Sequence, residues 1–214
     1  MSGILIDMNL SRPWGLIRSP IDIEVLLVLS GTTRPFTGRE VARLVRTGSQ
    51  PAVNASLRRL AEEGLVRADE AGNAYLHTLN REHLGAPVVE LLRDMRRELE
   101  RRLRAEIEEW EIAPTHASIF GSAARGDGDT RSDIDIFVVR PTGVDEDDAG
   151  WRRQLDQLAD DVYAWTGNHA GISEVSAADV RRLRRERPPV VDELRRDAIT
   201  LAGPTPTELF GRSG

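Results

Sequence analysis

The stretch FGSAARGDGDTRSDIDIFVV, residues 120–139, decides how the second half of this chain folds. The apolar run from His116 to Phe120 predicts a strand, and Gly121-Ser122 predicts a tight turn into a short helix over Ser122 to Arg125. Gly121 lets a ligand approach the backbone, and the Ser122 hydroxyl can donate to a phosphate oxygen. Free amides at a helix start attract anions. The turn therefore predicts a phosphate contact, although a Gly-Ser pair alone is also compatible with an ordinary turn.

The segment Ser132-Asp133-Ile134-Asp135 supplies two carboxylates at the start of an apolar strand that runs to Val139. Alternate residues of a strand share a face, so the two Cα atoms lie roughly 6 to 7 Å apart. Such carboxylates repel each other unless cations lie between them, and two Mg²⁺ ions about 3.5 to 4 Å apart would relieve that repulsion. The alternative is that both acids are exposed and paired with Arg125 or Arg131.

Together these elements resemble the signature of the DNA polymerase β nucleotidyltransferase superfamily, in the form found in minimal nucleotidyltransferases. The matching parts are Gly121-Ser122, Arg125-Gly126-Asp127 and Ser132-Asp133-Ile134-Asp135, within a resemblance that covers about residues 114–202. The resemblance implies a small mixed-sheet fold that transfers a nucleoside monophosphate from an NTP to a hydroxyl with Mg²⁺ or Mn²⁺. It implies catalytic and metal-binding carboxylates at Asp133 and Asp135, and NTP binding by Gly121, Ser122, Arg125 and Ser132.

A third carboxylate usually completes such a site from a later strand. Glu174, in the expected strand from Gly171 to Val175, is the candidate for a catalytic and metal-binding role, with Asp179 in the following helix as the alternative. The sequence leaves this choice open.

The N-terminal part predicts a winged helix-turn-helix over residues 1–80. Apolar spacing indicates helices over Ile21 to Leu29 and Gln50 to Glu63, and Thr37 with Glu40 forms a capping box before a short helix between them. Strand-like runs at residues 65–67 and 74–77 flank a turn and indicate a hairpin. Three helices and a hairpin in this order are typical of that module.

Such a module commonly places its third helix in the DNA major groove. The polar residues available there for DNA binding are Ser49, Gln50, Asn54, Arg58 and Arg59. The same span has nine arginines against eight acids, which is weak charge for a DNA-binding module. Protein contacts or dimerisation are the alternative.

The remaining segments complete an α+β fold with a long connecting helix. Apolar residues recur at helical spacing from Val88 to Trp110, so residues 81–112 are expected to form this helix, packed on the hairpin and on the following domain or, alternatively, along a homodimer seam. Residues 113–202 are the expected nucleotidyltransferase domain, with a helix from Val190 to Leu201, and residues 203–214 a loosely held tail. The absence of cysteine excludes thiolate metal sites. No membrane segment or signal peptide is apparent, so a cytoplasmic protein is expected.

Two functions compete at this point. The first is an Mg²⁺-dependent nucleotidyltransferase whose acceptor is a protein or an RNA, because no separate acceptor domain follows residue 202; DNA-binding autoregulation fits beside it, and the resemblance also allows a toxin-antitoxin pair. The second is a DNA-binding transcriptional regulator whose nucleotidyltransferase fold only senses nucleotide. A purely structural dimeric scaffold is a third. The sequence does not identify the base of the NTP, the acceptor or a DNA target.

Overall fold

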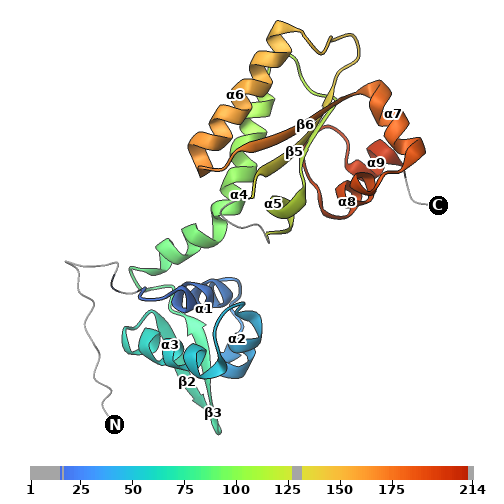
Figure 1. Ribbon diagram of the computed structural model, residues 1–214. Coiled ribbons are helices and arrows are strands. Elements are labelled where there is room, and N and C mark those ends of the chain that lie inside the picture. The colour runs from blue at the N-terminus through green and yellow to red at the C-terminus, as the bar shows by residue number, and fades with distance from the viewer. Residues whose placement is uncertain (1–14, 16, 127–131, 212–214) are drawn as a thin grey trace. The chain divides into compact units, whose positions relative to one another are not determined.

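The computed structural model describes residue 15, residues 17–126 and residues 132–211 (Figure 1). The chain divides into two compact units, Met1–Arg96 and Arg97–Gly214. The division falls inside helix α4 (Ala86–Glu108), so the connecting helix contributes to both units. Within the described residues, no helix has the length and apolar content that crossing a lipid bilayer requires.

Among its described residues, the first unit combines three complete helices and the first part of α4 with a three-stranded antiparallel sheet of order β1-β3-β2. In chain order its elements are α1 (Pro20–Ser30), β1 (Phe36–Thr37), α2 (Gly38–Leu44), α3 (Gln50–Glu62), β2 (Val66–Ala71) and β3 (Ala74–Leu79). The capping box predicted for Thr37 and Glu40 is confirmed, with both side chains bonded to backbone amides at the start of α2. Strand β1 was not predicted, because two residues are too few to show an alternation.

The core of this unit lies where the three helices meet. Val25 and Leu29 of α1, Val41 of α2, and Leu57 and Leu60 of α3 are all almost fully buried. Their spacing of three to four residues within α1 and α3 is the apolar periodicity seen in the sequence.

The apolar stripe of α4 does not form one continuous buried seam. Val89 belongs to the core of the first unit, and Leu103 and Ile107 belong to the main core of the second. Between them, Leu91 and Met95 are largely exposed. The homodimer seam considered from the sequence stays a prediction.

The second unit is built on a mixed four-stranded sheet of order β6-β5-β4-β7, in which β5 and β6 are parallel and the other pairs antiparallel. Its elements after α4 are β4 (His116–Ile119), α5 (Gly121–Arg125), β5 (Ile134–Arg140), α6 (Ala149–Thr166), β6 (Ala170–Ser176), α7 (Ala177–Glu186), α8 (Pro189–Asp197), β7 (Ile199–Ala202) and α9 (Pro206–Phe210). Helices and sheets together confirm the α+β class.

The sheet of the second unit carries helices on both faces. Ile136 and Val138 of β5 point toward α4 and α6, where Trp151 and Leu158 are fully buried. Phe137, on the opposite face of β5, packs in a cluster with residues of α7, α8 and α9. Figure 1 shows this layering, with α4 and α6 on one side of the sheet and α7, α8 and α9 on the other. The alternation along β5 therefore separates two cores.

Two predictions for the C-terminal end are wrong. The helix expected from Val190 to Leu201 ends at Asp197, and the chain continues as strand β7, which pairs with β4. The expected loose tail contains α9, whose Phe210 is buried against α7 and α8. Thr205 and Glu208 form a capping box at the start of α9, and this Thr-x-x-Glu spacing is visible in the sequence.

Candidate active site

The turn between β4 and α5 brings Gly121 against the carboxylate of Asp135. Gly121 has φ of +66°, a left-handed conformation that favours glycine. A Cβ atom at this position would overlap Asp135 Oδ2 and lie 3.3 Å from its Cγ. The Phe120 amide donates to the Asp135 carbonyl oxygen at 3.0 Å and holds the turn to β5. Ser122 follows as the second residue of α5, partly exposed. The structure thus brings Gly121, Ser122 and Asp135 together.

The start of β5 is anchored by the turn that precedes β6. The Ile134 amide donates to the carbonyl oxygen of His169 at 2.8 Å, and Asn168 Nδ2 donates to the carbonyl oxygen of Ser132 at 3.0 Å. These bonds fix the backbone on both sides of Asp133, whose side chain is exposed. Nothing in the sequence pattern singled out Asn168, because its contact is with a backbone atom far along the chain.

Asp135 carries unbalanced negative charge. Burial raises the pKa of its carboxyl above the ordinary value, the charges of Asp133 and Glu193 raise it further, and Arg125 lowers it in part. Asp135 is therefore harder to ionise than a free aspartate, which is the electrostatic situation that a bound cation would reverse.

Arg125 binds to acids of helix α8. Its Nη1 atom lies 2.9 Å from Glu193 Oε1 and 3.8 Å from Asp197 Oδ2. These ion pairs differ from the alternative considered from the sequence, in which Arg125 pairs with the two strand carboxylates. Arg131, the other partner considered, and Asp127 lie outside the described residues.

The structure does not bring Glu174 to the other two carboxylates, which corrects the expectation that it completes their set. In the parallel pairing of β5 with β6, Glu174 is the partner of Val138, three residues beyond Asp135 and on the opposite face of the sheet. There it forms an ion pair with Arg140 at 2.8 Å, and both side chains are nearly buried. The alternative, Asp179, accepts bonds from the amide and hydroxyl of Ser176 and caps α7.

The residues of β6 that share the face of Asp135 are Gly171, Ser173 and Val175, the partners of Asp135, Phe137 and Val139. A Cβ atom on Gly171 would lie 3.0 Å from Asp135 Oδ1 and 3.8 Å from Asp133 Cβ. Strand β6 therefore passes close to both carboxylates without offering a third one.

Residues 96–195 match the family model described as a nucleotidyltransferase domain. This part of the chain is therefore similar to nucleotidyltransferase domains. The matched residues include the Gly121 turn and both strand carboxylates. A comparison with curated proteins finds no match to the sequence.

Two solved structures are similar to about half of the chain. One is a crystal structure of a toxin-antitoxin with AMP-PNP, with 17% identity, TM-score 0.34, and coverage of 52% of this chain and 79% of that one. The other is a mutant of the toxin-antitoxin MntA-HpeT, with 16% identity, TM-score 0.36 and the same coverage.

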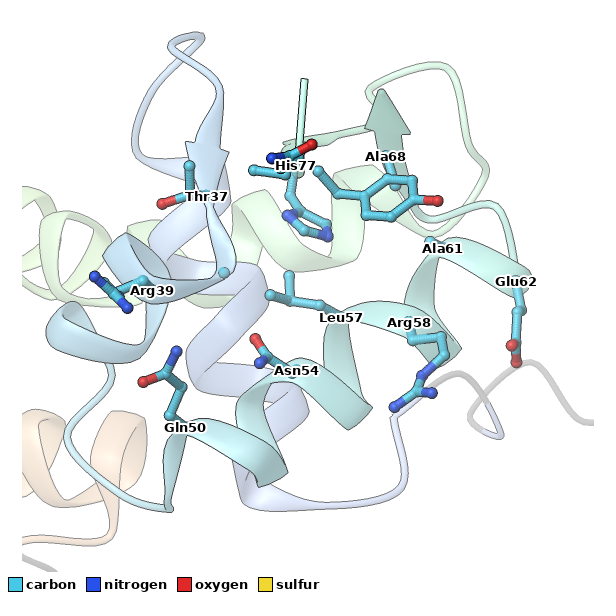
Figure 2. Close-up of a pocket in the computed structure, with 14 residues that line it drawn as sticks. Thr37, Arg39, Gln50, Asn54, Leu57, Arg58, Ala61, Glu62, Ala68 and His77 are labelled. Carbon is cyan, nitrogen blue, oxygen red and sulfur yellow. The ribbon is translucent and has the colours of Figure 1, made fainter. Parts of the chain in front are cut away.

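Outside the nucleotidyltransferase domain, the first unit contains a groove of about 1220 Å³ between α3, the start of α2 and the hairpin β2–β3 (Figure 2). Three of the predicted DNA-binding residues, Gln50, Asn54 and Arg58, line it along α3. Tyr75 and His77 line it from β3. Ser49, also predicted, is exposed and caps α3 by accepting a bond from the Ala52 amide.

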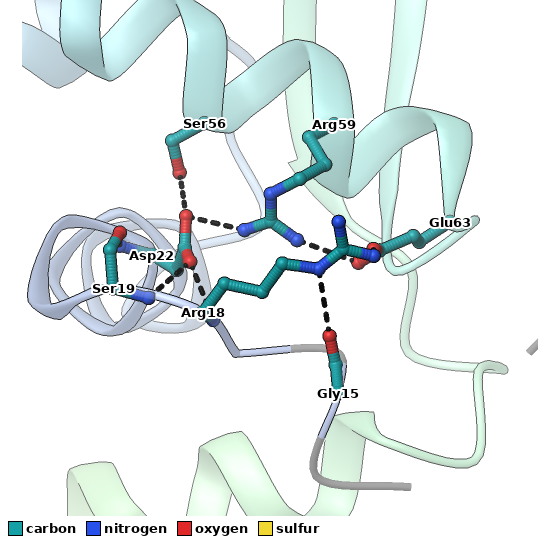
Figure 3. A network of polar contacts seen from close by, with 7 residues as sticks. All are labelled: Gly15, Arg18, Ser19, Asp22, Ser56, Arg59 and Glu63. Carbon is teal, nitrogen blue, oxygen red and sulfur yellow. Dashed lines mark hydrogen bonds and ion pairs between the residues drawn. The ribbon is translucent and has the colours of Figure 1, made fainter. Parts of the chain in front are cut away.

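Arg59 does not share that groove, which corrects its assignment as a DNA-binding residue. Its guanidinium forms ion pairs with Asp22 and Glu63, both almost completely buried (Figure 3). Ser56 donates to the same Asp22 carboxylate at 2.6 Å, and Arg18 bonds to Glu63 at 2.7 Å. Arg59 follows Arg58 by one residue, so it points about 100° away around the helix and fastens α3 to α1.

Proposed function

We propose that this chain transfers a nucleoside monophosphate from an NTP to a hydroxyl group of a macromolecule, either a protein or an RNA. The observation that carries the proposal is the close contact between the Gly121 turn and the Asp135 carboxylate, which is possible only because Gly121 has no side chain. A phosphate bound by the turn would lie beside a pair of carboxylates suited to hold its counter-ions.

The residues present fit a divalent metal ion. Asp133 and Asp135 supply hard oxygen ligands, and Mg²⁺ is commonly held by one or two carboxylates together with substrate phosphates. The charge that raises the pKa of Asp135 would be balanced by such an ion. No group of three acids or histidines able to hold a metal occurs among the residues that the structure describes, so Asp133 and Asp135 would be the protein's ligands. Two Mg²⁺ or Mn²⁺ ions would activate the attacking hydroxyl and neutralise charge on the leaving pyrophosphate.

The protein residues would bind and orient the nucleotide. We expect the Gly121 backbone and the Ser122 hydroxyl, at the start of α5, to contact phosphate oxygens, and Arg125, at the end of the same helix, to supply positive charge near Asp135. The anchored backbone at Ser132 keeps Asp133 in register with Asp135. Positioning and charge neutralisation are the main contributions an enzyme makes to this class of reaction.

Label transfer tests the proposal directly. The purified protein is incubated with each of the four NTPs, labelled at the α-phosphate, with Mg²⁺ or Mn²⁺ and with cell extract as a source of acceptors. Labelled protein or RNA that disappears with Asp133→Ala and Asp135→Ala is the expected result. The matched control is Asp156→Ala, a surface substitution on α6 of the same charge change. Absence of transfer with every nucleotide and metal, from folded protein, would contradict the proposal.

A second function, DNA binding by the first unit, is supported by the way Gln50, Asn54 and Arg58 line one groove. We infer that this unit is a winged helix-turn-helix in which α3 reads base edges. DNA binding would serve autoregulation if the chain is an active enzyme, or transcriptional regulation if the chain only senses nucleotide. Binding of the full chain to a random DNA pool, with Asn54→Ala and Arg58→Ala as variants, tests it. Specific DNA binding without label transfer would favour the sensing regulator.

A further inference from the structure

The nucleotidyltransferase site lacks a third carboxylate on its sheet. On β6, the face shared with Asp135 carries Gly171, Ser173 and Val175, while Glu174 points to the other face and pairs with Arg140. A reaction that removes a proton from a hydroxyl group still needs an acceptor for that proton. An acid on one of the helices around the turn would have to accept this proton.

Helix α8 supplies an acid to this place. Helix α8 packs against α5, the helix that begins at Gly121. Glu193 lies on the side of α8 that meets α5, where its carboxylate bonds to Arg125 at 2.9 Å and its side chain is 34% exposed. Asp192, its neighbour, is 67% exposed and pairs with Arg195 of the same helix at 3.6 Å rather than with Arg125. The charge of Glu193 is close enough to help raise the pKa of Asp135.

Arg125 connects Glu193 with the phosphate site. Arg125 is the last residue of α5 and binds to both Glu193 and Asp197, one helical turn apart on α8. A triphosphate carries more charge than one carboxylate and presents several oxygens, so it competes effectively for a guanidinium. Movement of Arg125 toward the phosphates would release the Glu193 carboxylate.

We propose that Glu193 is the third catalytic acid of this site, masked by Arg125 until an NTP takes over the guanidinium. The inference rests on the proposed nucleotidyl transfer. In the reaction, the acceptor oxygen forms a bond to the α-phosphorus and its proton passes to a Glu193 carboxylate oxygen. The bond from the α-phosphorus to the bridging oxygen breaks, and pyrophosphate leaves with that electron pair. No oxidant, reductant or further reactant is needed.

Glu193→Gln separates this role from that of a simple counter-ion. Loss of the charge removes the competitor for the guanidinium, so a non-hydrolysable ATP analogue with Mg²⁺ should bind to this variant as tightly as to the unaltered protein or more tightly, by calorimetry. Label transfer at saturating NTP should fall on the order of 100-fold or more, the usual contribution of a general base. Asp192→Asn, with the same loss of charge on the exposed side of α8, should stay within about threefold of the unaltered rate.

The outcomes distinguish this inference from the function on which it rests. If the unaltered protein transfers label and Glu193→Gln transfers it at the same saturated rate with a lower KM, Glu193 is only a counter-ion of Arg125 and the inference is overturned. If Glu193→Gln loses nucleotide binding together with transfer while its melting temperature is unchanged, Glu193 acts in binding and the inference again fails. If the folded, unaltered protein transfers no label, the proposed function fails first. Glu193→Asp, which keeps the carboxylate, should recover part of the rate.

Discussion

Replacement of Gly121 by alanine should have two distinct effects, a loss of stability from the left-handed backbone and a loss of activity from displacement of the Asp135 carboxylate. The left-handed backbone at Gly121, with φ of +66°, costs an alanine about 1 to 2 kcal/mol. The new methyl group would also overlap Asp135 Oδ2, and the carboxylate must rotate away because its Cγ lies only 3.3 Å from the Cβ position. Rotation of one side chain costs little stability, but it moves a proposed metal ligand by about 1 Å or more, a displacement that can reduce a rate on the order of 100-fold.

Gly143→Ala is the matched control in the same unit. Gly143 has φ of +91°, so alanine is strained there too, but no atom lies within 4 Å of its Cβ position. Both variants should lose about 1 to 2 kcal/mol of unfolding free energy in urea titrations. Only Gly121→Ala should lose label transfer. Transfer by Gly121→Ala within about threefold of the unaltered rate would refute the reasoning, because the Asp135 carboxylate would then not need its present position.

Three further predictions concern charge. Because the pKa of Asp135 is raised, its contribution to folding is present below the ordinary aspartate pKa and is lost as pH rises through the raised value; Asp135→Asn should therefore stabilise the metal-free protein at neutral pH by about 0.5 to 2 kcal/mol in thermal melts, and a destabilised variant would contradict this. Burial raises the pKa of Asp22, but bonds from Ser56, the Arg18 amide and Arg59 outweigh it and the net pKa is lowered, so its contribution is present above the ordinary pKa and is lost as pH falls through the lowered one. Asp22→Ala should cost about 3 to 5 kcal/mol in urea titrations at neutral pH, and a cost below about 1 kcal/mol would show that the buried network is not stabilising. Arg58→Ala should weaken DNA binding without changing the melting temperature, whereas Arg59→Ala should lower the melting temperature; equal effects of the two variants on both measurements would contradict the placement of Arg59.

The site segment could be predicted from the sequence because its signals are local. A turn that needs Gly121 and two carboxylates spaced by one residue are fixed by backbone geometry within a few residues of each other. The helix starts at Thr37 and Ser49 were equally accessible, because capping depends on side chains next to the helix. Local patterns of this kind do not depend on how the helices and strands are arranged in the tertiary structure.

The third carboxylate could not be predicted in the same way. Placing Glu174 required the register of β6 against β5, and a shift of one residue moves a side chain to the other face of a sheet. The sequence identifies the strand but not its register. The strand β7 was missed for a similar reason, since Ile199 to Ala202 is short and continues from a helix, and only its pairing with β4 distinguishes it from a further helical turn.

Arg58 and Arg59 show that residue type alone does not identify the DNA-binding residues of a helix, because the position around the helix decides what each side chain contacts. Both follow the apolar residue Leu57 on α3, and residue type alone gives them the same affinity for phosphate. The rotation between neighbouring residues on a helix sends Arg58 to the groove and Arg59 to Asp22 and Glu63.

The charges around Asp135 favour a site that responds to nucleotide and metal together. Without ligands, Asp135 faces the negative charges of Asp133 and Glu193, while Arg125 is bound by acids of α8. A cation alone would relieve the carboxylates but would leave Arg125 where it is, and a triphosphate alone would bring more negative charge to the same place. Each ligand therefore improves the site for the other, and this coupling must be reciprocal. Nucleotide affinity measured with and without Mg²⁺ should differ by the same factor as Mg²⁺ affinity with and without nucleotide, after correction for the complex that the two form in solution. Removal of the repulsion by Asp135→Asn should reduce that factor toward one, and an unchanged factor would show that the coupling arises elsewhere.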